Sequence, residues 1–294
     1  MLIFGNGGAG KTLTALNLDA GLLGLDGYGY LLGEPITPLP AGESVLFLAL
    51  DGPAETAASW RRLKTPAGRD VGKLAGDRLT VRTRLPLSPS HDDSGAVAEY
   101  VRQLETNTGQ RFAAVTVDNL VKLYGDVSQP GRASFAAVSL AALEADGRSL
   151  VVITQSKKNT RPKNEDGALL AQGALFGMGT ILSLYKTREG TRDGDRPTVA
   201  ELRHYKGPGA DGGKPSAVSI DLPTGRLSIE ADADLRADVA KLPAAAFSSA
   251  DIADALEVSQ PTASRFATKA EAAGQITFDH KGVHGAKYWR KVGK

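Results

Sequence analysis

The residues best suited to chemistry lie near the beginning of the chain, in the segment Gly5-Asn-Gly-Gly-Ala-Gly-Lys-Thr12. An apolar run at residues 2–4 reads as a short buried strand, and a stretch that opens a helix follows from Thr12. Glycines in such a turn let several backbone N–H groups point at one anion, and the helix dipole adds positive charge. The pattern therefore predicts a phosphate-binding loop of the Walker A type.

Each residue of this loop has an expected role if the bound molecule is ATP. Lys11 would reach the β- and γ-phosphates, and the hydroxyl of Thr12 would ligate Mg²⁺. The residues expected to surround the nucleotide are Gly5, Asn6, Gly7, Gly8, Ala9, Gly10, Lys11, Thr12 and Leu13. The competing interpretation is a glycine-rich turn that merely lies beside a lysine.

Polar residues also stand at the ends of three apolar runs further along the chain, namely Asp51, Asp118 and Gln155. In parallel sheets, ligands bind at the carboxyl ends of the strands. Asp118 is predicted to be a Walker B aspartate that holds Mg²⁺, Asp51 could orient or deprotonate the attacking water, and Gln155 could sense the γ-phosphate. Each has a structural alternative, because Asp and Gln also cap strands, and Asp51 begins a good turn sequence, Asp-Gly-Pro.

The elements that would position these residues alternate along the chain. Apolar runs predict buried strands at residues 2–4, 45–50, 79–82, 112–117 and 150–154. Amphipathic stretches predict helices at residues 54–64, 96–106 and 134–146. This alternation predicts an α/β domain with a mainly parallel sheet. Short alternating runs predict antiparallel strands that extend the sheet, at residues 181–185, 199–203, 217–221 and 226–229.

A polar and basic segment, residues 156–167, follows Gln155 and has no apolar period. It carries four cations, Lys157, Lys158, Arg161 and Lys163, which could neutralise DNA phosphates at the carboxyl side of the sheet. A run of charges is otherwise a solvated surface loop, and that interpretation stays open.

Composition limits the class of protein. With 294 residues and a hydrophobic fraction of 41%, the chain can form one large α/β domain with a small appendage. The absence of cysteine excludes disulfides and thiolate metal sites and predicts a reducing, cytoplasmic location. The apolar runs are too short to cross a bilayer. The net charge of +2 neither requires nor excludes a nucleic-acid partner.

Composition changes after residue 230, which predicts an ATPase domain at 1–230, a linker helix and hinge at 231–247, and a second domain at 248–294. The last segment has capped helical stretches at 248–256 and 259–274. Two short strands with a turn between them follow, at 276–278 and 287–292. Helix, turn, helix and hairpin together predict a winged helix-turn-helix domain.

This second domain has its own candidate DNA contacts. Gln260, Thr262, Ser264 and Arg265 would face a groove of double-stranded DNA, while Lys281 and Arg290 would approach phosphates from the wing. The segment 248–294 carries seven Lys/Arg against five Asp/Glu, a modest excess. Because winged helices also serve protein contacts alone, that alternative stays open.

The motifs at residues 5–12, 44–51, 113–118 and 150–155 resemble those of RecA-like ATPases, in particular the hexameric replicative helicases of the plasmid RepA type and their phage relatives. The resemblance covers roughly residues 1–229. It implies Lys11 and Thr12 on the phosphates and magnesium, Asp51 as the catalytic carboxylate and Asp118 as the Walker B residue. It also implies that Arg203 and Lys206 reach a neighbouring subunit's nucleotide, which requires a homo-oligomer such as a hexamer.

Two functions compete on this basis. The first is an ATP-driven motor, a helicase or translocase that moves on single-stranded DNA in a phage or plasmid replication system. The second is a DNA-binding regulatory or loading ATPase that uses ATP as an assembly switch. A RecA-type recombinase shares the core, but nothing else in the sequence favours it.

Overall fold

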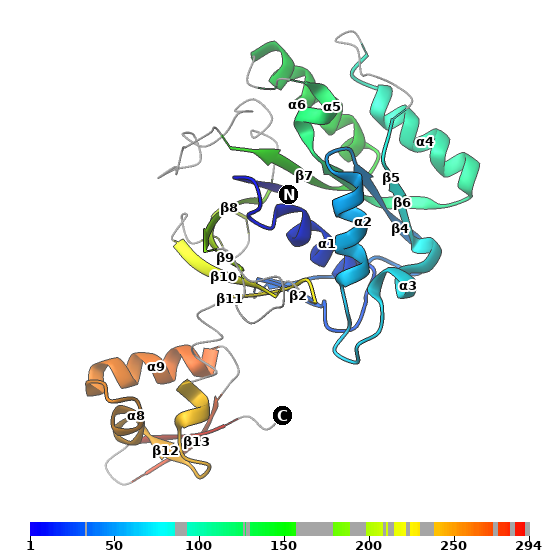
Figure 1. The fold of residues 1–294 in the computed structure, drawn as a ribbon. Coiled ribbons are helices and arrows are strands. Elements are labelled where there is room, and N and C mark those ends of the chain that lie inside the picture. Colours follow the sequence, from blue (N-terminus) through cyan, green and yellow to red (C-terminus); the bar gives the residue numbers. More distant parts are fainter. Residues whose placement is uncertain are drawn as a thin grey trace. The chain divides into compact units, whose positions relative to one another are not determined.

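The structure is a computed structural model of the chain (Figure 1). It describes residues 1–32, 34–85, 93–125, 127, 130–156, 179–188, 198–207, 210, 215–221, 224–229, 238–272, 276–282 and 286–291. Within it the chain divides into two compact units, Met1–Leu227 and Ser228–Lys294. Each unit has its own hydrophobic core, so each is considered by itself.

A nine-stranded sheet forms the centre of the first unit, in the order β11-β10-β9-β8-β1-β7-β6-β4-β5. Its strands are β1 (Leu2–Gly5), β4 (Glu43–Ala49), β5 (Leu79–Arg82), β6 (Arg111–Asp118), β7 (Ser149–Gln155), β8 (Ile181–Arg188), β9 (Thr198–Lys206), β10 (Pro215–Asp221) and β11 (Arg226–Ile229). The strands from β8 to β5 in this order are parallel to one another. β9 is antiparallel to β8, and β10 is antiparallel to β9. The sheet is therefore mainly parallel, as predicted.

The direction of β8 differs from the prediction. Its alternating pattern suggested an antiparallel strand, but β8 pairs in parallel with β1, from Leu2 with Ile181 to Gly5 with Leu184. Alternation reports that one face of a strand is more buried than the other and carries no information on direction. About 25 residues separate β7 from β8, which is long enough for the crossover that parallel pairing requires.

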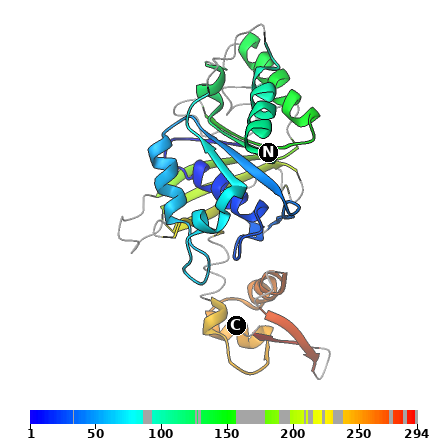
Figure 2. The same cartoon turned by 90° about the vertical axis from the view of Figure 1, so that its right-hand side faces the viewer.

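Helices cover both faces of this sheet (Figures 1 and 2). They are α1 (Lys11–Leu22), α2 (Pro53–Arg62), α3 (Val71–Ala75), a short 3-10 helix (Gly76–Arg78), α4 (Ala96–Thr108), α5 (Leu120–Tyr124) and α6 (Pro130–Ala145). A two-stranded piece, β2 (Tyr30–Leu31) with β3 (Glu34–Pro35), lies between α1 and β4 in the chain. No helix among the described residues is both long and apolar enough to span a bilayer.

Two hydrophobic clusters hold the layers together. On one face α1, α2 and α3 contribute residues such as Leu16 and Trp60, which pack with Phe47 of β4. On the other face α4, α5 and α6 pack on the sheet through residues such as Val101 and Leu140. Neighbouring positions of one strand alternate between the two clusters, which is why the strands read as continuous apolar runs.

Parallel pairing brings the predicted functional residues to one edge of the sheet. Gly5 at the end of β1 pairs with Gln155 at the end of β7, and Asp118 at the end of β6 lies beside Ala49 at the end of β4. The phosphate loop follows β1 and Asp51 follows β4, so both begin at this edge. The carboxyl ends of four central strands therefore converge on one site.

Among its described residues, the second unit contains the helices α8 and α9, a helical stretch at residues 238–241, and a three-stranded antiparallel sheet in the order β12-β14-β13. Its elements are β12 (Phe247–Ser248), α8 (Ser249–Leu256), α9 (Gln260–Ala272), β13 (Ile276–Lys281) and β14 (Lys287–Lys291). Ser248 caps α8 in a capping box with Asp251. Two helices and two paired strands therefore follow one another in the order that the sequence predicts, and their assignment to a winged helix-turn-helix domain stays a prediction.

Part of the segment predicted to be a linker and hinge belongs to the core of this unit. Val239, Leu242 and Phe247 are buried there with Ile252 and Trp289. The composition of the run Pro-Ala-Ala-Ala before Phe247 suggested a hinge. The apolar residues on either side of this run, Leu242 and Phe247, are however buried in the core of the unit. A unit this small can bury few apolar side chains, so it uses those of the preceding segment.

Candidate active site

The phosphate loop connects β1 to α1 in a backbone conformation that requires glycine. Gly10 caps α1 at φ +86°, and a Cβ there would lie only 2.4 Å from Cδ1 of Ile220. Gly8 also has a positive φ, +70°. The first turn of α1 begins at this point, with Thr14 N–H donating to Gly10 O at 2.8 Å. The loop thus leaves its backbone and the positive end of α1 accessible to an anion.

Lys11 lies against the loop that precedes it. Its Nζ donates to Gly5 O at 3.0 Å and to Asn6 O at 2.7 Å. Burial lowers the pKa of Lys11, and the negative charges of Asp118 and Asp51 oppose this shift. Since a partly desolvated ammonium interacts strongly with anions, Lys11 is suited to hold a phosphate within the loop.

Thr12 and Asp118 form a hydroxyl–carboxylate pair below the loop. Thr12 Oγ1 donates to Asp118 Oδ2 at 2.6 Å, and the Asp118 residue is only 3% exposed. Burial raises the pKa of Asp118 to about 6, the bond from Thr12 lowers it, and neighbouring Asp51 raises it. Mg²⁺ prefers such oxygen ligands and would stabilise the ionised carboxylate. The residues present therefore fit a magnesium ion at this position.

Asp51 lies beside this pair and is fixed by its neighbours. Asn119 Nδ2 donates to Asp51 Oδ2 at 2.6 Å, and Lys122 Nζ lies 3.9 Å from Asp51 Oδ1. The backbone N–H groups of Leu50 and Asp51 donate to Asp118 O at 2.6 and 3.0 Å. The Asp51 side chain is 37% exposed, so its carboxylate is oriented and still accessible to water.

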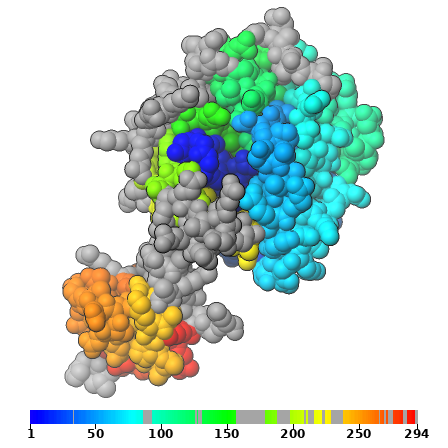
Figure 3. Space-filling view, in the orientation of Figure 1, coloured from blue at the N-terminus to red at the C-terminus, as the bar shows by residue number. Residues whose placement is uncertain are grey.

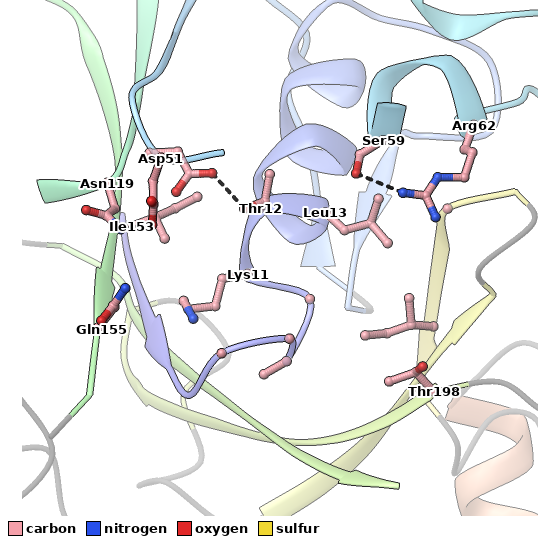
Figure 4. A pocket seen from close by; sticks show the side chains of 17 residues that line it. Lys11, Thr12, Leu13, Asp51, Ser59, Arg62, Asn119, Ile153, Gln155 and Thr198 are labelled. Atoms are coloured by element: carbon pink, nitrogen blue, oxygen red, sulfur yellow. Dashed lines mark hydrogen bonds between the residues drawn. The ribbon is translucent and has the colours of Figure 1, made fainter. Parts of the chain in front are cut away.

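These residues line one cavity of about 370 Å³, a size typical of small-molecule sites. In Figure 3 the dark blue N-terminal residues lie in a recess beside the blue residues of the α2 region. Figure 4 places Asp51, Asn119 and Gln155 on one side of Lys11, and Ser59 and Arg62 on the other. The predicted residues in its lining are Gly7, Gly8, Ala9, Gly10, Lys11, Thr12, Leu13, Asp51, Asp118 and Gln155.

Seven lining residues were not predicted: Ser59, Arg62, Asn119, Ile153, Thr198, Ile220 and Gly225. Asn119 had a usable signal, because it directly follows a strand-ending aspartate. Ser59 and Arg62 lie on α2, where Arg62 Nη2 donates to Ser59 Oγ at 3.4 Å. The others come from strand residues and a turn that only the folded sheet brings to the loop. No sequence motif marks them.

Arg203 and Lys206 do not line this chain's own cavity. Both lie on β9, where Arg203 pairs with Ser183 and Lys206 with Ile181, towards the amino end of β8. Arg203 Nε also donates to Glu201 Oε1 at 2.9 Å. Their expected action on the nucleotide of a neighbouring subunit stays a prediction.

The candidate DNA contacts divide into two groups. Lys157, Lys158, Arg161 and Lys163 lie outside the described residues. Gln260, Thr262, Ser264 and Arg265 belong to α9, and the first three are exposed. In the hairpin Lys281 is exposed, whereas Arg290 Nη2 lies 2.9 Å from Asp279 Oδ1. The charge of Arg290 is thus partly compensated within the chain.

A mainly parallel sheet with a glycine loop, a Thr–Asp pair and a second carboxylate at its carboxyl edge defines a P-loop nucleotide-binding domain. Comparison with known proteins agrees. Residues 1–160 match the family model described as AAA domain (AAA_25), and the chain belongs to this family. No curated protein matches the chain.

Among solved structures, the ATPase domain of G40P is similar to this chain in fold. The TM-score is 0.52 at 13% sequence identity, over 77% of this chain and 82% of that chain. The shared fold is the α/β arrangement of an ATPase domain.

Proposed function

We propose that this protein binds ATP with Mg²⁺ and hydrolyses it. One observation carries the proposal: Lys11, Thr12, Asp118 and Asp51 surround the same cavity at the carboxyl edge of the sheet. The cavity combines a loop for phosphates, oxygens for a divalent ion and an accessible carboxylate. Phosphoryl transfer depends mainly on such positioning and on charge stabilisation.

Each residue of the site has its own role in the proposed hydrolysis. The loop backbone and Lys11 bind the phosphates, and Lys11 neutralises charge that develops on the γ-phosphoryl group. Mg²⁺, held by Thr12 and Asp118, supplies further positive charge when bound. Asp51, held by Asn119, orients the attacking water and accepts its proton as the bond from the γ-phosphorus to the leaving oxygen breaks. The products are ADP and inorganic phosphate.

We further infer that hydrolysis drives motion on DNA, as in a helicase or translocase of a phage or plasmid replication system. The support is the resemblance of four motifs to RepA-type hexameric helicases, together with the cations at residues 157–163. On this proposal Arg203 and Lys206 complete the site of a neighbouring copy, so the active form is a homo-oligomer. The likeness to the ATPase domain of G40P supports the fold on which this rests.

The test is ATP hydrolysis with and without single-stranded DNA, at concentrations where sedimentation shows the oligomer. A motor requires strong stimulation by DNA that is lost in Lys11→Ala and Arg203→Ala proteins. Mixing the two inactive variants with each other adds a sharper test. If Arg203 acts in a neighbour's site, a mixture of Lys11→Ala and Arg203→Ala proteins should recover part of the activity that each lacks.

The topology of the second unit favours one other function, a DNA-binding regulatory or loading ATPase. Helix α9 exposes Gln260, Thr262 and Ser264 beside a hairpin, as a winged helix reading double-stranded DNA would do. Replacing these three residues by alanine separates the functions. A motor keeps its stimulation by single strands, whereas a site-specific regulator loses its binding to double-stranded DNA.

A further inference from the structure

A second lysine contacts the phosphate loop from β8. A Cβ built on Gly8 would lie 3.4 Å from Nζ of Lys186, so the ammonium of Lys186 reaches the crest of the loop. The backbone N–H of Lys186 donates to Asn6 Oδ1 at 3.0 Å. One hydrogen bond and the proximity of its ammonium to Gly8 therefore relate residue 186 to the loop that follows β1.

The two lysines approach the loop from different sides. Lys11 bonds the carbonyls of Gly5 and Asn6 and lines the cavity. Lys186 is half-buried on the strand that pairs with β1, outside the residues that line the cavity. Charges interact over about 8 Å at physiological ionic strength, so an ammonium at the loop crest is only partly screened from an anion that the loop binds.

We propose that Lys186 is a second phosphate-directed cation, which positions the loop and selects the more highly charged nucleotide. This inference rests on the proposed ATP binding and goes beyond it by assigning a determinant of triphosphate over diphosphate affinity. Lys186 acts through the loop crest and through its charge, so it is a positioning residue. Its backbone bond to Asn6 also ties the loop to β8, the strand that leads towards Arg203 on β9.

The size of the effect follows from charge. For two unit charges roughly 8 Å apart, an effective dielectric constant of about 20 corresponds to a change in affinity of roughly tenfold or more before screening by salt. With Mg²⁺ bound, ATP carries about one more negative charge than ADP. With screening included, we expect the loss of the Lys186 charge to lower the affinity for ATP about tenfold and the affinity for ADP about threefold.

The experiment measures the affinities of Mg·ATP and Mg·ADP by titration calorimetry at 50 and 300 mM salt. The proteins are wild type, Lys186→Gln, Lys186→Arg and Lys73→Gln, the last being a control at an exposed lysine of α3. Hydrolysis is suppressed by using a non-hydrolysable ATP analogue in parallel. Thermal unfolding without nucleotide confirms that each protein is folded.

The proposal expects Lys186→Gln to reduce the preference for ATP over ADP and to flatten the salt dependence, with Lys186→Arg and Lys73→Gln close to wild type. An equal loss of affinity for both nucleotides, with an unchanged dependence of affinity on salt, would mean that Lys186 only supports the loop. This result overturns the proposal. No change at all also overturns it. If wild type binds neither nucleotide, the proposed function fails instead. Lys11→Ala protein gives the reference signal for the absence of binding.

Discussion

Asp19 gives the sharpest prediction about stability. It lies on α1 two turns beyond Thr12, is fully buried, and accepts hydrogen bonds from Thr116 Oγ1 at 2.9 and 3.0 Å. Burial raises the pKa of Asp19 from 3.8 to about 8, and the bond from Thr116 opposes this only in part. The carboxyl is therefore protonated in the folded protein at neutral pH and ionised in the unfolded chain.

The sign and size of the pH dependence follow by linkage. Because the pKa of Asp19 is higher in the folded than in the unfolded protein, Asp19 contributes to the free energy of unfolding at low pH. This contribution is complete below about pH 4 and is lost as the pH rises through about 8. At about 1.4 kcal/mol per pKa unit, the loss between pH 5 and pH 8 is on the order of 3–4 kcal/mol. Asp19→Asn removes the titration, although its buried amide costs about 1–3 kcal/mol at every pH if it lacks a partner.

The assay is urea unfolding of wild type and Asp19→Asn at pH 5 and pH 8. The chain has two tryptophans, and Trp289→Phe in both proteins leaves Trp60 as the reporter of the first unit. The free energy of unfolding of the variant, relative to the parent, should rise by about 3–4 kcal/mol from pH 5 to pH 8. Asp26→Asn makes the same chemical change at an exposed residue and is the control. A relative stability of Asp19→Asn that is the same at both pH values refutes the reasoning.

Three further predictions concern the site. Gly10→Ala should lower the free energy of unfolding by about 1–3 kcal/mol in thermal melts, because φ is +86° and the added Cβ would clash with Ile220; an unchanged melting temperature contradicts the loop geometry. Thr12→Val should raise the Mg²⁺ concentration needed for hydrolysis about tenfold, while Thr12→Ser should leave it unchanged. If both variants need the same Mg²⁺ concentration, the hydroxyl of Thr12 is not a ligand of the metal. Asn119→Ala should lower kcat about tenfold with little change in KM, because it frees the Asp51 carboxylate; a change in KM alone would assign Asn119 to binding.

Local features of the sequence predicted the parts of the site that local chemistry determines. The glycine loop must have small residues, and apolar runs that end in Asp118 and Gln155 must be strands that end at one edge. Each of these signals is contained in a stretch of about ten residues. They can therefore be recognised without any knowledge of the tertiary structure.

The features that were missed depend on tertiary pairing. The direction of β8 is set by its partner β1, and alternation along β8 is the same in either direction. Lys186 and Arg62 reach the loop region only after the sheet and α2 assemble. Phe247 lies after a run of alanines that suggested a hinge, yet the small C-terminal core buries it completely.

The most direct test of the central claim, hydrolysis of ATP at this cavity, is a single-turnover measurement with protein in excess over labelled ATP. Wild type and Asp51→Asn are compared in the presence of single-stranded DNA, and ATP affinity is measured separately. The account predicts that Asp51→Asn binds ATP within about threefold of wild type and cleaves it at least about 100-fold more slowly. Cleavage by Asp51→Asn at the rate of wild type, or no cleavage by wild type, would contradict it.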